Sequence, residues 1–184
     1  MAKVRLTITT VTTTAVDLVD ESGLDALSLS AVARELGVGP SALYTHCDGL
    51  EGLRHLVAVA ATNNLTRDLQ TAAIGNAGHD ALDAMGDAYR RFAESHPGQF
   101  ASTLRPPDPS HEELQAATAL LLEVFTLVFA AMGLAGEDST RAARSTRSAI
   151  HGFLAIEHLT GSPDGGSDDF QHLLDTLRDG LLGR

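Results

Sequence analysis

The segment GVGPSALYTHCDGLEGL, residues 37–53, contains four closely spaced side chains that are able to form hydrogen bonds with DNA. Ser41, Tyr44, Thr45 and His46 share one side of a short helix, which we expect to begin at the proline because its missing N–H is not needed there. A short helix placed this way after another short helix is the usual arrangement for inserting side chains into a DNA groove. Yet the segment has no Lys or Arg, the residues that supply much of the affinity for DNA.

The overall composition restricts how such a contact could be made. The chain has 184 residues, a formal net charge of −11 and a single cysteine, Cys47. An acidic chain does not coat nucleic acid or anionic membrane by bulk attraction, so any contact with DNA must be local. One cysteine excludes an internal disulfide and suits a reducing interior. With no secretory signal at the N-terminus, we expect a cytoplasmic protein in which Cys47 packs as a small apolar residue, with a redox role as the alternative.

Other kinds of chemistry find little support in the sequence. Gly37, Gly39 and Ala42 have the spacing of a dinucleotide-binding fingerprint, but that fingerprint requires a preceding strand, and the residues before it have helical periodicity. The histidines lack the spacing of a zinc motif, and no nucleophile elbow or paired carboxylates are apparent. We therefore expect that the protein is not an enzyme and binds no metal and no cofactor.

Helical periodicity runs through the whole chain. Ser28 is expected to cap the second helix, which ends at Gly37, and Gly23 is expected to stop the first helix in a left-handed conformation. The predicted helices cover residues 5–21, 28–36, from 40 onward, 50–73, 79–95, 97–104, 110–132, 137–160 and 167–182. The predicted fold is all-α: a three-helix helix-turn-helix head, residues 1–48, joined by a long fourth helix to a helical bundle within residues 49–184.

The segment 116–136 is long and apolar enough to resemble a membrane span. Its central Glu123 would be costly in lipid, and no basic residue lies close to either end. We expect a core helix of a soluble protein, buried on two sides, and no association with a membrane.

Two further sites are predicted in the bundle. A cavity between bundle helices could bind a small apolar ligand, which would be neutral or weakly polar because none of the predicted lining residues is basic: Met85, Tyr89, Phe92, Leu104, Leu121, Phe125, Phe129 and His151. Tyr89 and His151 would orient it. The last two helices are amphipathic and need an apolar partner surface, which predicts a homodimer held by Ala149, Ile150, Phe153, Leu154, Phe170, Leu173, Leu174 and Leu177.

The segment ALSLSAVARELGVGPSALYTHCDGLEGL, residues 26–53, resembles the DNA-binding head of TetR-family transcriptional regulators. The segments YRRFAESHPGQF and AIHGFLAIE are similar to the subgroup whose C-terminal domain is named for a Trp-His-Gly motif, which here reads Ile150, His151 and Gly152 and lacks the Trp. The resemblance implies a homodimer formed by the last two helices, a third helix in the major groove of double-stranded DNA, and a ligand pocket whose occupation weakens DNA binding.

Carried over position by position, the resemblance implies a set of DNA-binding residues: Ser28, Gly39, Pro40, Ser41, Tyr44, Thr45 and His46. To these we add Lys3 and Arg5, the basic residues of an N-terminal arm. Two positions depart from the family pattern. Leu50 replaces a phosphate-binding Lys, and Cys47 replaces an aromatic residue. Residues 1–60 also hold four basic against seven acidic side chains. We predict a ligand-responsive repressor that binds a palindromic operator, the alternative being a dimeric ligand-binding or interaction protein whose DNA-binding head has decayed.

Overall fold

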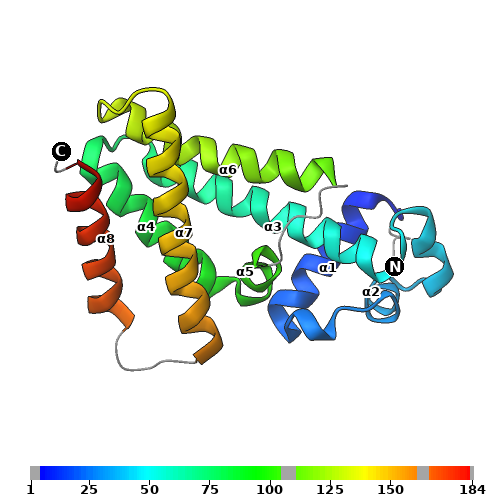
Figure 1. Cartoon of the computed structure of the whole chain (residues 1–184). Coiled ribbons are helices and arrows are strands. Elements are labelled where there is room, and N and C mark those ends of the chain that lie inside the picture. The colour runs from blue at the N-terminus through cyan, green and yellow to red at the C-terminus, as the bar shows by residue number, and fades with distance from the viewer. Residues whose placement is uncertain (1–4, 105–110, 161–165, 183–184) are drawn as a thin grey trace. The chain divides into compact units, whose positions relative to one another are not determined.

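The computed structural model describes residues 5–104, 111–160 and 166–182, and the described residues form helices with no strand among them (Figure 1). The predicted all-α fold, with a helix-turn-helix before a C-terminal helical domain, is confirmed. The elements are α1 (Ile8–Ser22), η1 (Leu24–Ala26), α2 (Leu29–Leu36), η2 (Pro40–Thr45), α3 (Gly49–Ala73), α4 (Gly78–Ser95), α5 (Pro97–Thr103), α6 (Glu112–Ala131), α7 (Glu137–Thr160) and α8 (Gly166–Leu182).

The chain divides into two compact units that interleave along the sequence. The N-terminal unit contains residues 1–63 and 96–115, and the C-terminal unit contains residues 64–95 and 116–184. Helix α5 therefore packs with the head, although more than seventy residues of sequence separate it from α1, a grouping that no local pattern could indicate. The predicted domain boundary at residue 48 divides the sequence into two consecutive parts, the DNA-binding head and the helical bundle. This division stays a prediction.

The first helix begins and ends differently from the prediction. Thr7 and Thr10 cap it reciprocally: the Thr10 amide donates to Thr7 Oγ1 over 3.1 Å, and the Thr7 amide donates to Thr10 Oγ1 over 2.9 Å. This capping box fixes the start at Ile8, where residue 5 was expected. At the other end, Gly23 has φ 83° and ψ 161°. The predicted left-handed stop is wrong, because a ψ of 161° lies far from the value of about +47° that the left-handed helical conformation requires.

The helix-turn-helix is built around a glycine and a short second helix. Ser28 Oγ accepts a hydrogen bond from the Ala31 amide over 3.1 Å, so the predicted cap of α2 is confirmed. Gly37 ends α2 in the left-handed region, with φ 66° and ψ 31°. The next helix, η2, is a six-residue 3₁₀ helix that opens with Pro40. Such tight helices occur in short pieces, so the third helix is short, as expected, and narrower than an α-helix.

A single apolar core joins α1, α2, η2 and the start of α3. Its buried members are Val11, Ala15, Leu18, Val19, Leu27, Val32, Ala33, Leu43, Cys47, Leu53 and Val57. The spacing of the four α1 residues follows the helical repeat, so one face of α1 is buried against the other elements. Burial of these side chains removes apolar surface from water and stabilises the arrangement that presents η2.

Helix α5 is fastened to the C-terminal end of α1. Gly98 lies so close that an added Cβ atom would stand 1.9 Å from the carbonyl oxygen of Val19. Asp20 accepts hydrogen bonds from the Gln99 amide over 3.0 Å and from Gln99 Nε2 over 2.7 Å, and it pairs with His96 Nδ1 at 2.8 Å. A carboxylate at the start of α5 also complements the positive end of that helix.

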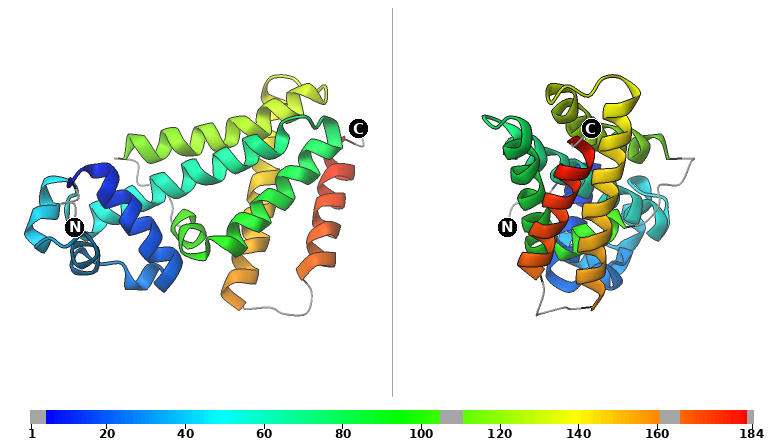
Figure 2. Two further views of the ribbon diagram at one scale, coloured as in Figure 1. Left: turned by 180° about the vertical axis from the view of Figure 1, so that it is seen from behind. Right: turned by 60° about the vertical axis from the view of Figure 1, so that its left-hand side comes forward.

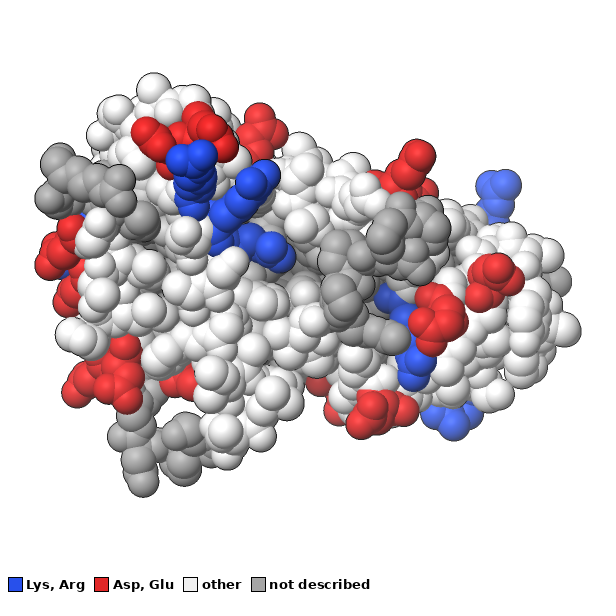
Figure 3. Space-filling view, viewed as in Figure 1, with Lys and Arg blue, Asp and Glu red and all other residues white. Residues whose placement is uncertain are grey.

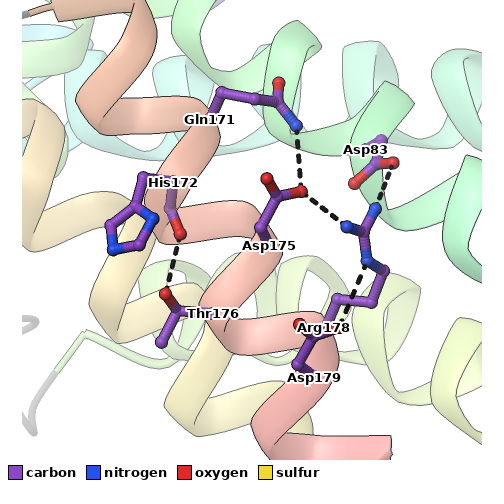
Figure 4. Close-up of polar contacts among 7 residues, drawn as sticks. All are labelled: Asp83, Gln171, His172, Asp175, Thr176, Arg178 and Asp179. Carbon is purple, nitrogen blue, oxygen red and sulfur yellow. Dashed lines mark hydrogen bonds and ion pairs between the residues drawn. The ribbon is translucent and has the colours of Figure 1, made fainter.

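In the C-terminal unit, α4, α7 and α8 pack together, with α7 and α8 side by side in opposite directions (Figure 2). Gly86 of α4 gives room for Leu174 of α8, whose methyl groups would lie 2.7 and 2.8 Å from an added Cβ. Arg178 of α8 bridges Asp175, at 2.6 Å, and Asp83 of α4, at 3.3 Å (Figure 4). Leu174 and Arg178 thus fix α8 on α4.

Helix α6 is long and apolar enough to cross a membrane by length and composition, and 33% of its most apolar window is buried. Leu121, Phe125 and Phe129 are buried on one face, whereas Leu120 and Leu127 are exposed. We expected this helix to be buried on two sides. That expectation is wrong, because Leu120 and Leu127 are apolar residues that lie outside the buried face and are exposed.

Candidate nucleic-acid interface and ligand site

The residues predicted to enter the DNA groove lie on the exposed side of η2. Leu43 is fully buried and anchors η2 in the head core, while Tyr44 is 62% exposed. Ser41 is exposed too and lies three residues from Tyr44, and in a 3₁₀ helix residues at this spacing are aligned along one edge. The structure thus holds an exposed Ser–Tyr edge on a fixed base.

Two of the predicted polar side chains already use part of their hydrogen-bonding capacity. Thr45 Oγ1 donates to the Ala42 carbonyl over 2.9 Å, so in this conformation it can only accept from a further partner. Ser28 Oγ accepts from the Ala31 amide. The hydroxyl groups of Ser41 and Tyr44, by contrast, form no hydrogen bond with the described part of the chain. Gly39 and Pro40 are exposed, and His46 is half-buried.

Basic side chains near this edge are few. Arg5 is exposed, and Lys3 lies outside the described residues. Arg34, which was not among the predicted DNA-binding residues, is exposed on α2, and its Nε stands 3.5 Å from Glu35. Its exposure could have been predicted from the sequence, because Arg34 lies on the polar face of an amphipathic helix. Arg54 is paired with Glu51 at 2.6 Å, so its charge is already balanced.

The two departures from the family pattern have structural explanations. Leu50 is partly buried against the head core, so it packs where a lysine would reach outward. Cys47 is buried, with its Sγ 3.6 Å from the Leu43 carbonyl oxygen. Burial and the neighbouring Asp48 raise the pKa of the Cys47 thiol, which keeps it in the unreactive form. These properties agree with a packing role for Cys47.

Six of the eight predicted ligand-binding residues are buried in the C-terminal unit: Met85, Tyr89, Phe92, Leu121, Phe125 and Phe129. His151, in the same unit, is half-buried, and its Nδ1 lies 2.8 Å from the Tyr89 hydroxyl. The two polar groups predicted to orient a ligand are therefore in direct contact with each other. Leu104, the remaining predicted ligand-binding residue, belongs to the N-terminal unit.

A basic residue accompanies this pair, contrary to the expectation of neutral surroundings. Arg147 precedes His151 by one turn of α7, and its guanidinium is within hydrogen-bonding reach of the Tyr89 hydroxyl. Burial raises the pKa of Tyr89 to about 12, although the Arg147 charge opposes the shift. Burial and, secondarily, Arg147 lower the pKa of His151 to about 4. Near neutral pH both partners are uncharged, and Arg147 carries the charge of the group.

The predicted dimer interface is divided between buried and accessible residues. Ile150, Leu154, Phe170 and Leu174 are buried within the C-terminal unit, so their inclusion in the interface stays a prediction. Their helical repeat marks the face that packs on α4. Ala149, Phe153, Leu173 and Leu177 remain partly exposed. Ile156 and Leu159 on α7, which were not among the predicted interface residues, are 64% and 77% exposed.

Comparisons with known proteins agree on the class of the chain. Residues 11–54 match the family described as bacterial regulatory proteins, tetR family, and residues 82–179 match the tetracyclin repressor-like C-terminal domain. A Mycobacterium tuberculosis protein described as an uncharacterised HTH-type transcriptional regulator is 36% identical over 154 residues, which cover 82% of this chain and 69% of that protein.

Solved structures show the same fold at lower identity. A protein of unknown function from Rhodococcus sp. RHA1 has a TM-score of 0.76 at 20% identity, with 100% of this chain and 97% of that chain covered. BioQ with its double-stranded DNA operator has a TM-score of 0.70 at 22% identity, with 98% and 100% covered.

Proposed function

Because the chain belongs to the TetR family of bacterial transcriptional regulators, we propose that it represses its targets as a homodimer on a palindromic operator and that a small, largely apolar molecule releases it. The proposed place of action is the cytoplasm. The observation that carries this proposal is the exposed Ser41–Tyr44 edge of η2, held in place by the buried Leu43. The similarity to BioQ, which was solved with its operator, supports it.

We propose the remaining DNA contacts from their positions. Gly39, Pro40, Thr45 and His46 flank the edge, Ser28 stands at the N-terminus of α2, and Lys3 and Arg5 belong to the N-terminal arm. The decayed-head alternative is disfavoured by the geometry, because a head under no selection for DNA binding has no need of an exposed tyrosine on a well-packed support. Membership of the Trp-His-Gly subgroup rests on Ile150, His151 and Gly152 and is likewise a proposal.

The proposed dimer uses the outer faces of α7 and α8. Two helices packed side by side expose apolar residues that a second copy would cover: Phe153, Ile156, Leu159, Leu173 and Leu177. A homodimer matches its own two-fold symmetry to a palindrome, so each head reads one half-site. The ligand would bind among the residues around Tyr89 and His151.

Selection of random double-stranded DNA with the purified protein tests the proposal. We expect recovery of a palindrome. On that DNA, Tyr44→Phe should weaken binding roughly tenfold, because each of two subunits loses a hydrogen bond of about 0.5–1.5 kcal/mol. Ile74→Ala provides the matched control, since Ile74 is 78% exposed but lies after α3 in the C-terminal unit. Failure to recover any sequence preference would favour the decayed-head alternative.

A further inference from the structure

We propose that the ligand carries a carboxylate, which Arg147 binds beside the Tyr89–His151 pair. This inference rests on the proposed ligand-responsive function and defines the chemical class of the ligand. It replaces the expectation of a neutral molecule, which rested on a set of lining residues that contains no arginine of α7.

The stripe consists of Arg141, Arg144 and Arg147, and Figure 3 shows basic side chains gathered over the N-terminal half of α7. Its members differ in their partners. Arg141 is exposed and pairs with Glu137 at 2.8 Å. Arg144 is exposed to solvent, which can hydrate its charge. Arg147 is half-buried, and no carboxylate in the described part of the chain pairs with it.

The Arg147 guanidinium has a hydrogen-bond donor without an acceptor in the described part of the chain. Its Nε is buried and has no hydrogen-bond partner in the described part of the chain. A buried donor without an acceptor is unfavourable, so such atoms in native proteins call for a specific explanation. A guanidinium presents Nε–H and a terminal N–H side by side, which matches the two oxygens of a carboxylate.

The neighbours of Arg147 favour an anion of single charge. Tyr89 and His151 are both neutral near pH 7, so neither repels an anion, and Tyr89 is committed to His151 over 2.8 Å. Arg147 supplies one positive charge, which balances one carboxylate. A phosphate monoester carries about two negative charges and would need a second cation. Met85 and Phe92, which flank Tyr89 on the buried face of α4, suit an apolar remainder of the ligand.

The experiment uses straight-chain carboxylates from hexanoate to hexadecanoate, each compared with its methyl ester and with the alkyl phosphate of the same length. Binding to the full chain without DNA is measured by calorimetry and by thermal shift. The expected result is that at least one carboxylate binds about tenfold or more tightly than its ester, in keeping with the strength of charged hydrogen bonds. Arg147→Gln should remove this preference, and Arg147→Lys should restore only part of it. Arg144→Gln, on the exposed part of the stripe, should leave it unchanged.

Equal affinity for acid and ester, an unchanged preference in Arg147→Gln, a stronger response to the phosphate, or no binding of any carboxylate would overturn the proposal. The thermal unfolding of each variant without ligand shows whether it is folded, and Arg147→Lys preserves the charge if Gln disturbs packing. Because DNA is absent, carboxylate binding by a protein that selects no operator would reject the regulatory function alone and keep the ligand class.

Discussion

Gly98→Ala tests whether α5 is fastened to α1 as closely as the structure indicates. The added Cβ would lie 1.9 Å from the Val19 carbonyl oxygen, 2.2 Å from its carbonyl carbon and 2.8 Å from the Asp20 amide nitrogen. All three atoms belong to the backbone of α1, so no side chain can rotate away. The first turn of α5 must therefore separate from α1 before an alanine can be accommodated.

Two costs and one gain determine the change in the free energy of unfolding. Overpacking of a close contact costs about 1–3 kcal/mol, and loosening the Asp20 hydrogen bonds with His96 and Gln99 costs about 1.5–3 kcal/mol. Replacing a helical glycine by alanine returns about 0.5–1 kcal/mol. The net destabilisation is about 3 kcal/mol, which lowers the Tm of a chain of this size by roughly 6–12 °C.

The assay is urea unfolding and a thermal scan of Gly98→Ala beside Gly180→Ala. Gly180 lies in α8, and an added Cβ there meets nothing within 4 Å. The control should therefore be neutral or slightly stabilised through helix propensity alone. If Gly98→Ala unfolds within about 0.5 kcal/mol of the unmodified protein, α5 does not contact α1 this closely, and the grouping of α5 with the head loses its main support.

Three further predictions concern the head, the helical bundle and His151. Leu50→Lys should cost about 1 kcal/mol of stability, because Leu50 packs on the head core; if the lysine reaches phosphate, each subunit should add about 0.9 to the magnitude of the log–log salt slope of operator binding. Leu174→Glu should unfold the chain rather than produce monomers, since it buries a charge against Gly86, whereas Leu173→Glu should leave a folded protein that sediments as a monomer. The pKa of His151 is about 4 in the folded state and 6.5 in the ordinary state, so the unfolded chain binds more protons between these values. Stability should fall by about 3 kcal/mol as the pH drops from 6.5 to 4, and His151→Gln should flatten that dependence in urea unfolding; an unchanged pH profile would contradict the half-buried, neutral state of His151.

The fold was accessible from the sequence where local chemistry decides it. The Ser28 cap, the turn at Gly37 and the apolar repeat of α1 all follow from neighbouring residues, and each is present in the structure. The start of α1 depended on two threonine side chains that cap each other, and the repeat alone extends past them. The docking of α5 on α1 could not be predicted, because it joins Asp20 to residues about eighty positions later.

Some properties of the site residues could likewise be predicted from the sequence, and others could not. Exposure of Tyr44 beside a buried Leu43 follows from the spacing of one short helix. Burial of Ile150 and Leu174 could not be separated from partner contact by sequence, since a face that packs on α4 and a face that packs on a second copy are equally apolar. Arg147 was within reach, because a spacing of four residues places it on the same side of α7 as His151.

An acidic head can hold DNA if the neutral groups at its surface do what lysines do elsewhere. The first turn of α2 contains no acidic residue, so the partial positive charge of its N-terminus is available to a phosphate. Ser41 and Tyr44 present hydroxyls that form no hydrogen bond with the described part of the chain. Contacts of this kind release few counterions, so operator affinity should depend only weakly on salt. Nonspecific attraction to other DNA weakens for the same reason. The lack of basic residues thereby lowers the background against which the operator must be recognised, and a head of modest affinity can still be selective when two of them bind one palindrome.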